Sequence, residues 1–140
     1  MELTLIDPRV DALYASELDL RYRVLRAPLG LSRSDVGFTG EHGALHLVAT
    51  EGERVVGCVL YDFASGRLRA MAVDPTLQRS GLGSRLVRRL EGELEGRGIR
   101  AVLLHARGDV VGFYERLGYT LRGEPFTEVG LVHRAMTKTW

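Results

Sequence analysis

The stretch Met71-Ala-Val-Asp-Pro-Thr-Leu-Gln-Arg-Ser-Gly-Leu-Gly-Ser84 joins an apolar, strand-like segment to a glycine-containing loop. The loop runs into a segment, Leu82 to Glu95, whose leucines recur at helical spacing. Glycine lets a backbone approach a ligand closely, and a helix start presents unpaired N–H groups at the positive end of its dipole. The stretch therefore predicts an anion site, most often one for phosphate. A tight strand-to-helix turn without a ligand is the alternative.

The loop differs from the two commonest phosphate-binding motifs. It lacks the Lys-Ser/Thr ending of a P-loop, and Leu86 occupies the third glycine position of the dinucleotide fingerprint G-x-G-x-x-G. These departures, and the lack of an acidic residue ending a second parallel strand, disfavour a domain for ATP or NAD. Arg79 and Arg85 flank the loop, and a guanidinium suits phosphate oxygens. Arg85 and Arg89 are four residues apart and share a helix face, which is either solvated or near bound phosphate.

The composition is that of an ordinary globular protein, with 45% hydrophobic and 26% charged residues. We expect residues 1–140 to form a single domain. A net charge of +1 gives no electrostatic case for a nucleic-acid partner. No segment is apolar enough for a membrane span or a signal peptide, so we expect a cytoplasmic protein. Cys58 is expected in the core, and the histidines show no metal-ligand spacing, so we expect no metal.

The order of expected elements indicates an α/β (α+β) fold. The strands are expected at 3–6, 45–50, 55–61, 67–73, 99–105, from 119, and at 131–137. The helices are expected from Asp7-Pro8 to about Arg26, at 82–95, and from an Asp109 cap to Leu117. A right-handed crossover through the 82–95 helix predicts a mixed sheet flanked by helices. The segment Gly30 to Gly43 is expected to be a loop, either a binding lid or a plain connection.

Three segments together resemble the GNAT superfamily of acyl-CoA-dependent N-acetyltransferases. Gln78 to Gly83 is similar to its Q/R-x-x-G-x-G/A pyrophosphate loop, and Phe113-Tyr114 with Gly118-Tyr119 is similar to its F-Y-x-x-x-G-F/Y segment. The segment from Glu124 to Met136 is similar to the E-x-F-x-E-x-G-x-x-H-x-x-M close of a bacterial subgroup. The resemblance covers nearly the whole chain and implies a mixed, splayed sheet.

The resemblance implies transfer of an acetyl group from acetyl-CoA to an amine. It places the pantetheine arm and the pyrophosphate of CoA against ten residues: Met71, Ala72, Val73, Gln78, Arg79, Ser80, Gly81, Leu82, Gly83 and Ser84. It implies that Tyr114 is the general acid for the leaving thiolate. His133 belongs to the closing motif and is the first candidate for the base. His105, Glu128 and Glu41 are also chemically able, whereas His46 is expected at the surface.

The chain departs from the family at Arg107, where many relatives carry Asn, so this position either contacts a CoA phosphate or is solvated. The near-neutral charge favours a small amine as the acceptor, and a homodimer is left open. A non-catalytic acyl-CoA-binding regulatory module is the alternative, because a fold does not fix a function. The intact Tyr114 favours the enzyme.

Overall fold

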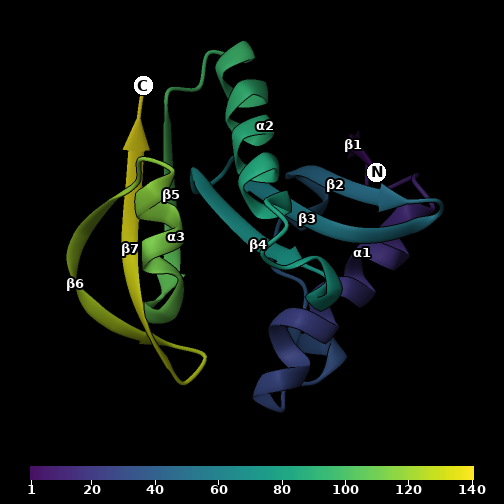
Figure 1. Ribbon diagram of the computed structural model, residues 1–140, viewed down its shortest axis with the longest axis horizontal. Coiled ribbons are helices and arrows are strands. Elements are labelled where there is room, and N and C mark those ends of the chain that lie inside the picture. Colours follow the sequence, from purple (N-terminus) through teal and green to yellow (C-terminus); the bar gives the residue numbers. More distant parts are fainter.

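The computed structural model describes residues 1–140 and contains one seven-stranded sheet in the order β1-β2-β3-β4-β5-β7-β6 (Figure 1). The strands are β1 (Glu2–Ile6), β2 (Leu45–Glu51), β3 (Arg54–Asp62), β4 (Arg67–Val73), β5 (Ala101–Arg107), β6 (Thr120–Glu128) and β7 (Leu131–Thr139). The α-helices are α1 (Leu13–Arg21), α2 (Leu82–Gly96) and α3 (Val111–Arg116). This mixed sheet with flanking helices confirms the predicted fold class.

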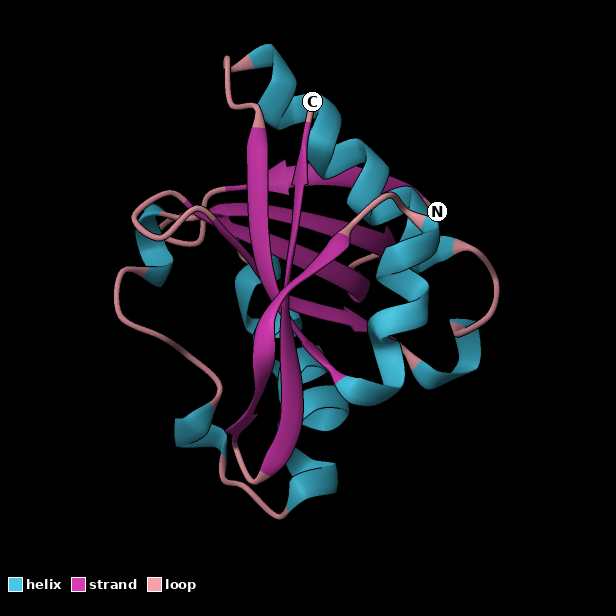
Figure 2. Ribbon diagram, turned by 90° about the vertical axis from the view of Figure 1, so that its left-hand side faces the viewer, coloured by secondary structure: helices cyan, strands magenta, loops and turns pink.

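The sheet consists of two antiparallel groups joined by one weak parallel contact. Strands β1 to β4 form one group, and β5, β7 and β6 form the other. The parallel pairing of β4 with β5 is confined to Arg67 and Leu103. Figure 2 shows the strands of the two groups running in clearly different directions. The sheet is therefore splayed, and the C-terminal half of β4 has no strand partner on its β5 side.

A β-bulge interrupts β4 just where the two groups separate. Cys58 pairs with Ala72 and Leu60 pairs with Arg69, so β4 carries one more residue than β3 over this interval. Ala70 takes up the extra residue with a left-handed φ of 53°. A bulge bends its strand and leaves a residue outside the ladder. The bend turns the end of β4 away from β5 and toward the loop that begins at Asp74.

Two apolar layers hold the sheet between helices. The predicted periodicity of α2 is confirmed, because one face of this helix is buried against the larger core through Leu82, Leu86, Val87, Leu90 and Leu94. Each such side chain contributes about 1.5–3 kcal/mol by leaving water. Leu20 of α1 belongs to a second core with Val48 and Leu60. Cys58 is fully buried in that second core, as expected. No helix is long and apolar enough to cross a bilayer.

The predicted start of the first helix at Asp7-Pro8 is wrong. The Asp7 carboxylate accepts hydrogen bonds from the backbone N–H and the guanidinium of Arg9, which holds this segment in a turn. The helix begins at Leu13, whose N–H donates to the Asp11 carboxylate. It continues as a π-helical turn over Tyr22–Arg26, which agrees with the expected end near Arg26.

Asp109 does not cap α3 as predicted. Its carboxylate accepts two hydrogen bonds from the Arg107 guanidinium, at 3.2 and 3.0 Å, and is therefore not available to the helix. A short 3-10 turn over Gly108–Val110 leads into α3 instead. The strand expected from residue 119 extends to Glu128 and forms a long hairpin with β7. The segment 30–43 is mostly loop with two short 3-10 turns, Arg33–Asp35 and Glu41–Gly43.

Candidate active site

An open cleft of about 1090 Å³ lies where the splayed strands separate. Its walls come from β4, β5, the loop before α2, helix α3, the end of the β6–β7 hairpin and the segment after α1. Of the residues predicted to hold CoA, eight line this cleft: Met71, Ala72, Val73, Gln78, Arg79, Gly81, Gly83 and Ser84. Tyr114 and His133 line it as well. The structure therefore brings both predicted catalytic side chains to the same cleft as the glycine loop.

The loop before α2 has the features of an anion site. The Gln78 amide donates to the Val73 carbonyl, 3.1 Å away, which folds the loop back on the end of β4. Arg79 and Gly81 both have left-handed φ values, 67° and 87°, and the second leads directly into the helix. The N-cap residue of α2, Gly81, offers no side-chain cap, and the Leu82 N–H donates to the Ser80 hydroxyl at 3.4 Å. The next N–H groups, of Gly83 and Ser84, are available to an anion at the positive end of the helix dipole.

Three positions near the loop lie away from the cleft. Ser80 is exposed and donates its hydroxyl hydrogen bond to the Leu77 carbonyl. The Leu82 side chain is buried in the larger core, so only its backbone faces the loop. Arg85 is exposed and does not line the cleft. A Cβ at Gly83 would lie 3.1 Å from the Met71 Cε atom, so glycine also lets the helix start pack against β4.

Tyr114 is a buried phenol at the cleft wall, with 6% of its surface exposed. Its ring makes edge contacts with Phe113 and Tyr119, at centroid distances of 4.9 and 5.7 Å. Burial alone raises the pKa of the Tyr114 hydroxyl above its ordinary value. The phenol therefore stays protonated around neutral pH, which is the state that a general acid needs.

Two histidines at the cleft wall both contact the ring of Phe126. The His133 ring stacks on Phe126 at 6.0 Å, and its Nδ1 lies 2.9 Å from the Leu131 carbonyl oxygen. The His105 ring meets the same phenyl edge-on at 4.9 Å, and its Nδ1 lies 2.8 Å from a Glu128 carboxylate oxygen. Since both partners are acceptors, each Nδ1 is the donor, and in a neutral ring Nε2 keeps a lone pair. A neutral imidazole at either position can thus accept a proton from a substrate.

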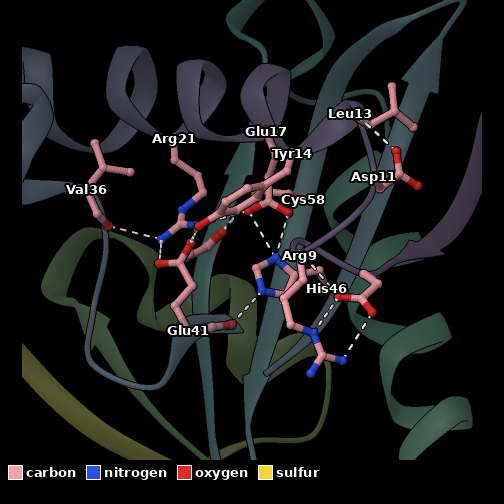
Figure 3. Close-up of polar contacts among 12 residues, drawn as sticks. Arg9, Asp11, Leu13, Tyr14, Glu17, Arg21, Val36, Glu41, His46 and Cys58 are labelled. Carbon is pink, nitrogen blue, oxygen red and sulfur yellow. Dashed lines mark hydrogen bonds and ion pairs between the residues drawn. The ribbon is translucent and has the colours of Figure 1, made fainter. Parts of the chain in front are cut away.

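A buried ionic network beneath α1 was not anticipated, and it corrects two predictions (Figure 3). His46 is fully buried rather than at the surface, with Nδ1 2.8 Å from the Glu17 carboxylate and Nε2 2.8 Å from the Glu41 carbonyl. Arg21 donates to Glu17 at 2.9 Å and to both carboxylate oxygens of Glu41. The Tyr14 hydroxyl donates to Glu41 too. This network ties α1 to the 37–43 segment.

Glu41 is therefore a structural ion-pair partner and not a candidate base. Burial alone would raise its pKa, but the hydrogen bonds from Arg21 and Tyr14 hold the pKa of this carboxylate below its ordinary value. It also lies outside the main cleft. The (i, i+4) spacing of Glu17 and Arg21 on one helix face was the only signal of this network in the sequence. Its partners Glu41 and His46 are distant in the chain, so only the folded arrangement unites them.

Arg107 also lies at the cleft wall. The Arg107 guanidinium lines the cleft while it is bonded to Asp109, so it is neither free nor fully solvated. The structure contains no group of three or more His, Cys, Asp or Glu side chains arranged to hold a metal ion. The cleft thus offers an anion loop, a buried phenol and two imidazoles, which are groups suited to acyl transfer.

The family model for the acetyltransferase (GNAT) domain matches residues 36–140. A Bacillus subtilis protein named as an acetyltransferase is 35% identical over 91 residues, which cover 65% of this chain and 58% of that protein. The N-acetyltransferase YitI of the same organism is 28% identical over 131 residues, or 86% of this chain and 88% of that protein. The chain belongs to the GNAT acetyltransferases, a family of acyltransferase enzymes.

A solved structure agrees with this membership at the level of the fold. The crystal structure of an aminoglycoside 6'-N-acetyltransferase complexed with coenzyme A matches with a TM-score of 0.76 and 21% identity, over 99% of this chain and 97% of that chain. At this identity the match supports the splayed fold alone. The chain spans a little under three fifths of the Bacillus acetyltransferase with the higher identity.

Proposed function

We propose that the chain transfers the acetyl group of acetyl-CoA directly to the amine of a small acceptor. The observation that carries this proposal is the continuity of one cleft, from the start of α2 along the unpartnered half of β4 to Tyr114 and His133. The CoA complex of the aminoglycoside acetyltransferase, which shares this fold, supports the choice of cosubstrate. The pyrophosphate would bind at Gln78 to Ser84, and the pantetheine arm would pair with Met71 to Val73.

The reaction needs an amine, a polarised carbonyl and a proton for the departing thiolate. The neutral amine nitrogen attacks the thioester carbonyl carbon, and the carbon–sulfur bond breaks as the amide forms. A backbone N–H at the free edge of β4 would stabilise the negative charge on the carbonyl oxygen. Tyr114 would give its phenolic proton to the sulfur, and His133 would take the proton that the amine loses. His105, which has the same available Nε2, is the second candidate for the base.

The acceptor is proposed to be small because the open part of the cleft is bounded on several sides. The segment after α1 and the β6–β7 turn both reach its walls. The chain carries a net charge of +1 and therefore has no strong field for a nucleic acid. Strong acetylation of a protein or nucleic acid, with no turnover of small amines, would contradict this part of the proposal.

Ligand-dependent melting followed by a thiol-release assay tests the proposal. A ligand that binds the native state raises the melting temperature, so acetyl-CoA and CoA should stabilise the protein while ATP and NAD should not. Thiol release with a panel of small amines should then exceed the rate without amine. Stabilisation by acetyl-CoA without acetylation of any amine would instead favour the non-catalytic acyl-CoA-binding module. Stabilisation by ATP or NAD alone would contradict the CoA site.

The identity of the base is tested by comparing His133→Gln with His105→Gln. The proposal expects a large loss of kcat in His133→Gln, with acetyl-CoA binding retained. If His105→Gln shows the larger loss instead, the base is the imidazole held by Glu128. If both variants keep the wild-type kcat when chemistry is rate-limiting, the amine loses its proton to water.

A further inference from the structure

Two arginines near the start of β4, Arg67 and Arg69, line the cleft. Arg67 and Arg69 are two residues apart and therefore project from the same face of the strand, while Leu68 between them is buried in the core beneath α2. The Arg69 guanidinium lies 4.0 Å from the ring centroid of Phe38, which belongs to the segment after α1. Both arginines line the cleft. They thus lie on the side where the 37–43 segment, rather than α2, forms the wall.

Neither guanidinium has a hydrogen-bond partner in the protein. The nearest carboxylates are Glu128 for Arg67 and Asp62 for Arg69, each at 3.9 Å, which is too long for a hydrogen bond. The Nε atom of Arg67 is buried without any partner. Buried polar groups in native proteins are nearly always paired, because an unpaired buried donor has lost its hydrogen bond to water without a replacement. Donors left open at a cleft wall therefore point to an acceptor group on a ligand.

The charge at this end of the cleft is positive. Arg26, Arg67 and Arg69 line it, whereas Glu128 is the only carboxylate among its walls there and is already bonded to His105. Arg26 is engaged by the backbone carbonyls of Leu25 and Asp35, so it adds charge without offering all its donors. A cleft lined by one sign of charge concentrates ligands of the opposite sign. The field favours an anion next to the reacting amine.

This basic end is distinct from the loop proposed for the CoA pyrophosphate. Arg67 stands at the start of β4, and the loop follows Val73 at the other end of the strand. Six residue steps of a strand cover roughly 20 Å. A CoA phosphate bound at the start of α2 would therefore be too far away to accept hydrogen bonds from Arg67 and Arg69.

We infer that the acceptor is an amine that also carries an oxyanion, a carboxylate or a phosphate, which Arg67 and Arg69 bind. The inference rests on the proposed acetyl transfer and names the class of its second substrate. A guanidinium matches the two oxygens of a carboxylate or phosphate with parallel N–H donors, and such charge-assisted bonds are the strong ones. Amino acids and amino phosphates both combine the required amine and oxyanion. The anion would hold the acceptor while its amine reaches the thioester.

The test compares matched acceptors in the acetyl-transfer assay. Each amino acid is assayed as the free acid and as its carboxamide, and O-phosphoethanolamine is assayed against ethanolamine. The acidic member of a pair should show a kcat/KM at least about tenfold higher, since a hydrogen bond to a charged group is worth about 1.5–3 kcal/mol. Preference within the carboxylate pairs or within the phosphate pair tells which oxyanion is bound.

Variants of Arg67 and Arg69 test whether these two side chains cause the preference for acidic acceptors. Arg67→Gln and Arg69→Gln should each lower kcat/KM for the acidic acceptor about tenfold or more, mainly through KM, and lower that for the neutral amine much less. Arg69→Lys keeps the charge but not the planar fork and should fall between the wild type and Arg69→Gln. Arg100→Gln removes an exposed arginine outside the cleft and is the matched control. Stabilisation by acetyl-CoA should persist in every variant and reports that each is folded.

The outcomes separate this inference from the proposed function. If neutral amines are acetylated as well as or better than their acidic partners, the inference is wrong and the acetyl transfer stands. If acidic amines are preferred but the arginine variants keep that preference, the anion binds elsewhere. If no amine of either kind is acetylated by a protein that binds acetyl-CoA, the proposed function itself has failed.

Discussion

At the scale of single residues, the cleft and the buried network use ionisable groups in opposite ways. Tyr114 has no charged partner, and burial keeps its hydroxyl protonated around neutral pH. His46, by contrast, has an acceptor at each ring nitrogen, so both nitrogens must carry hydrogen and the ring is a cation. We propose that the first residue exchanges a proton, whereas the second residue holds one. Each role has a distinct experimental signature.

Replacing Tyr114 with Phe removes the hydroxyl and keeps the ring that packs against Phe113 and Tyr119. General acid catalysis is typically worth about 10²–10⁴ in rate, so kcat should fall by that order. Binding of acetyl-CoA and the melting temperature should change little, because the lost contact acts in the transition state. Steady-state thiol release with separately measured acetyl-CoA affinity checks this. If melting and binding collapse together, Tyr114 is a core residue only.

The cationic state of His46 predicts how stability depends on pH. Burial alone would lower the pKa of His46, but the hydrogen bond and charge of Glu17 raise it above the ordinary value. The raised folded-state pKa means that this stabilisation is complete below the unfolded pKa of about 6.5. It is lost as the pH rises through the higher folded value. The difference in unfolding free energy between wild type and His46→Gln should therefore shrink as the pH is raised.

Denaturant unfolding of both proteins from about pH 6 to about pH 10 measures that difference. Titrations of groups that do not interact with His46 are shared by the two proteins and cancel in the comparison. A difference that stays constant over this range, or grows with pH, would show that His46 is not held as a cation.

At the scale of secondary-structure elements, the start of α2 packs against β4 and also forms the proposed phosphate site. A substitution can separate these two roles. Gly83 packs its Cα toward Met71 and Phe113, so a side chain there would disturb packing as well as any ligand. Ser84 lines the cleft and sits in the first turn of the helix, which makes it the cleaner position for a test. A change at Ser84 can alter charge without inserting atoms between the helix and β4.

Ser84→Asp should weaken acetyl-CoA binding at least about tenfold, since it puts a carboxylate where the pyrophosphate is proposed to lie. The same charge is favourable at a helix N-terminus by about 0.3–1 kcal/mol, so melting of the free protein should be unchanged or slightly raised. Ser84→Asn has the same shape without the charge and should bind nearly as the wild type does. Calorimetric titration measures both affinities for acetyl-CoA. Equal affinities of the Asp and Asn variants would contradict the proposal that the pyrophosphate binds at this loop.

The elements also show what a single sequence can and cannot predict. The β2–β3 hairpin, β4 and α2 were predicted nearly to the residue, because their apolar periods of 2 and 3.6 are local properties. The start of α1 was predicted wrongly because the Asp7 carboxylate accepts hydrogen bonds from Arg9 in a turn. The cap of α3 was predicted wrongly because the Asp109 carboxylate pairs with Arg107. Both errors concern an aspartate whose side chain had two partners within reach. Sequence spacing shows which partners each aspartate can reach, but it does not show which hydrogen bond is more stable in the folded chain.

At the scale of the whole molecule, the site arises from how the two strand groups meet. The glycine loop and Tyr114 could be found from motifs, and the structure brings them to one cleft. The sequence does not show that the N–H donors of Arg67 and Arg69 are unpaired or that His46 is buried. Both features depend on residues from distant segments of the chain. The bulge at Ala70 and the single β4–β5 contact likewise belong to the folded chain.

We propose that acetyl-CoA occupies the gap between β4 and β5, with its pyrophosphate at the start of α2. Amide hydrogen exchange with and without acetyl-CoA measures this directly, since bound backbone N–H groups exchange more slowly. We expect slower exchange at residues 71–73 and 80–84 on addition of acetyl-CoA, with little change in β1 and β2. Protection confined to segments outside the cleft, or no protection at saturating acetyl-CoA, would contradict it.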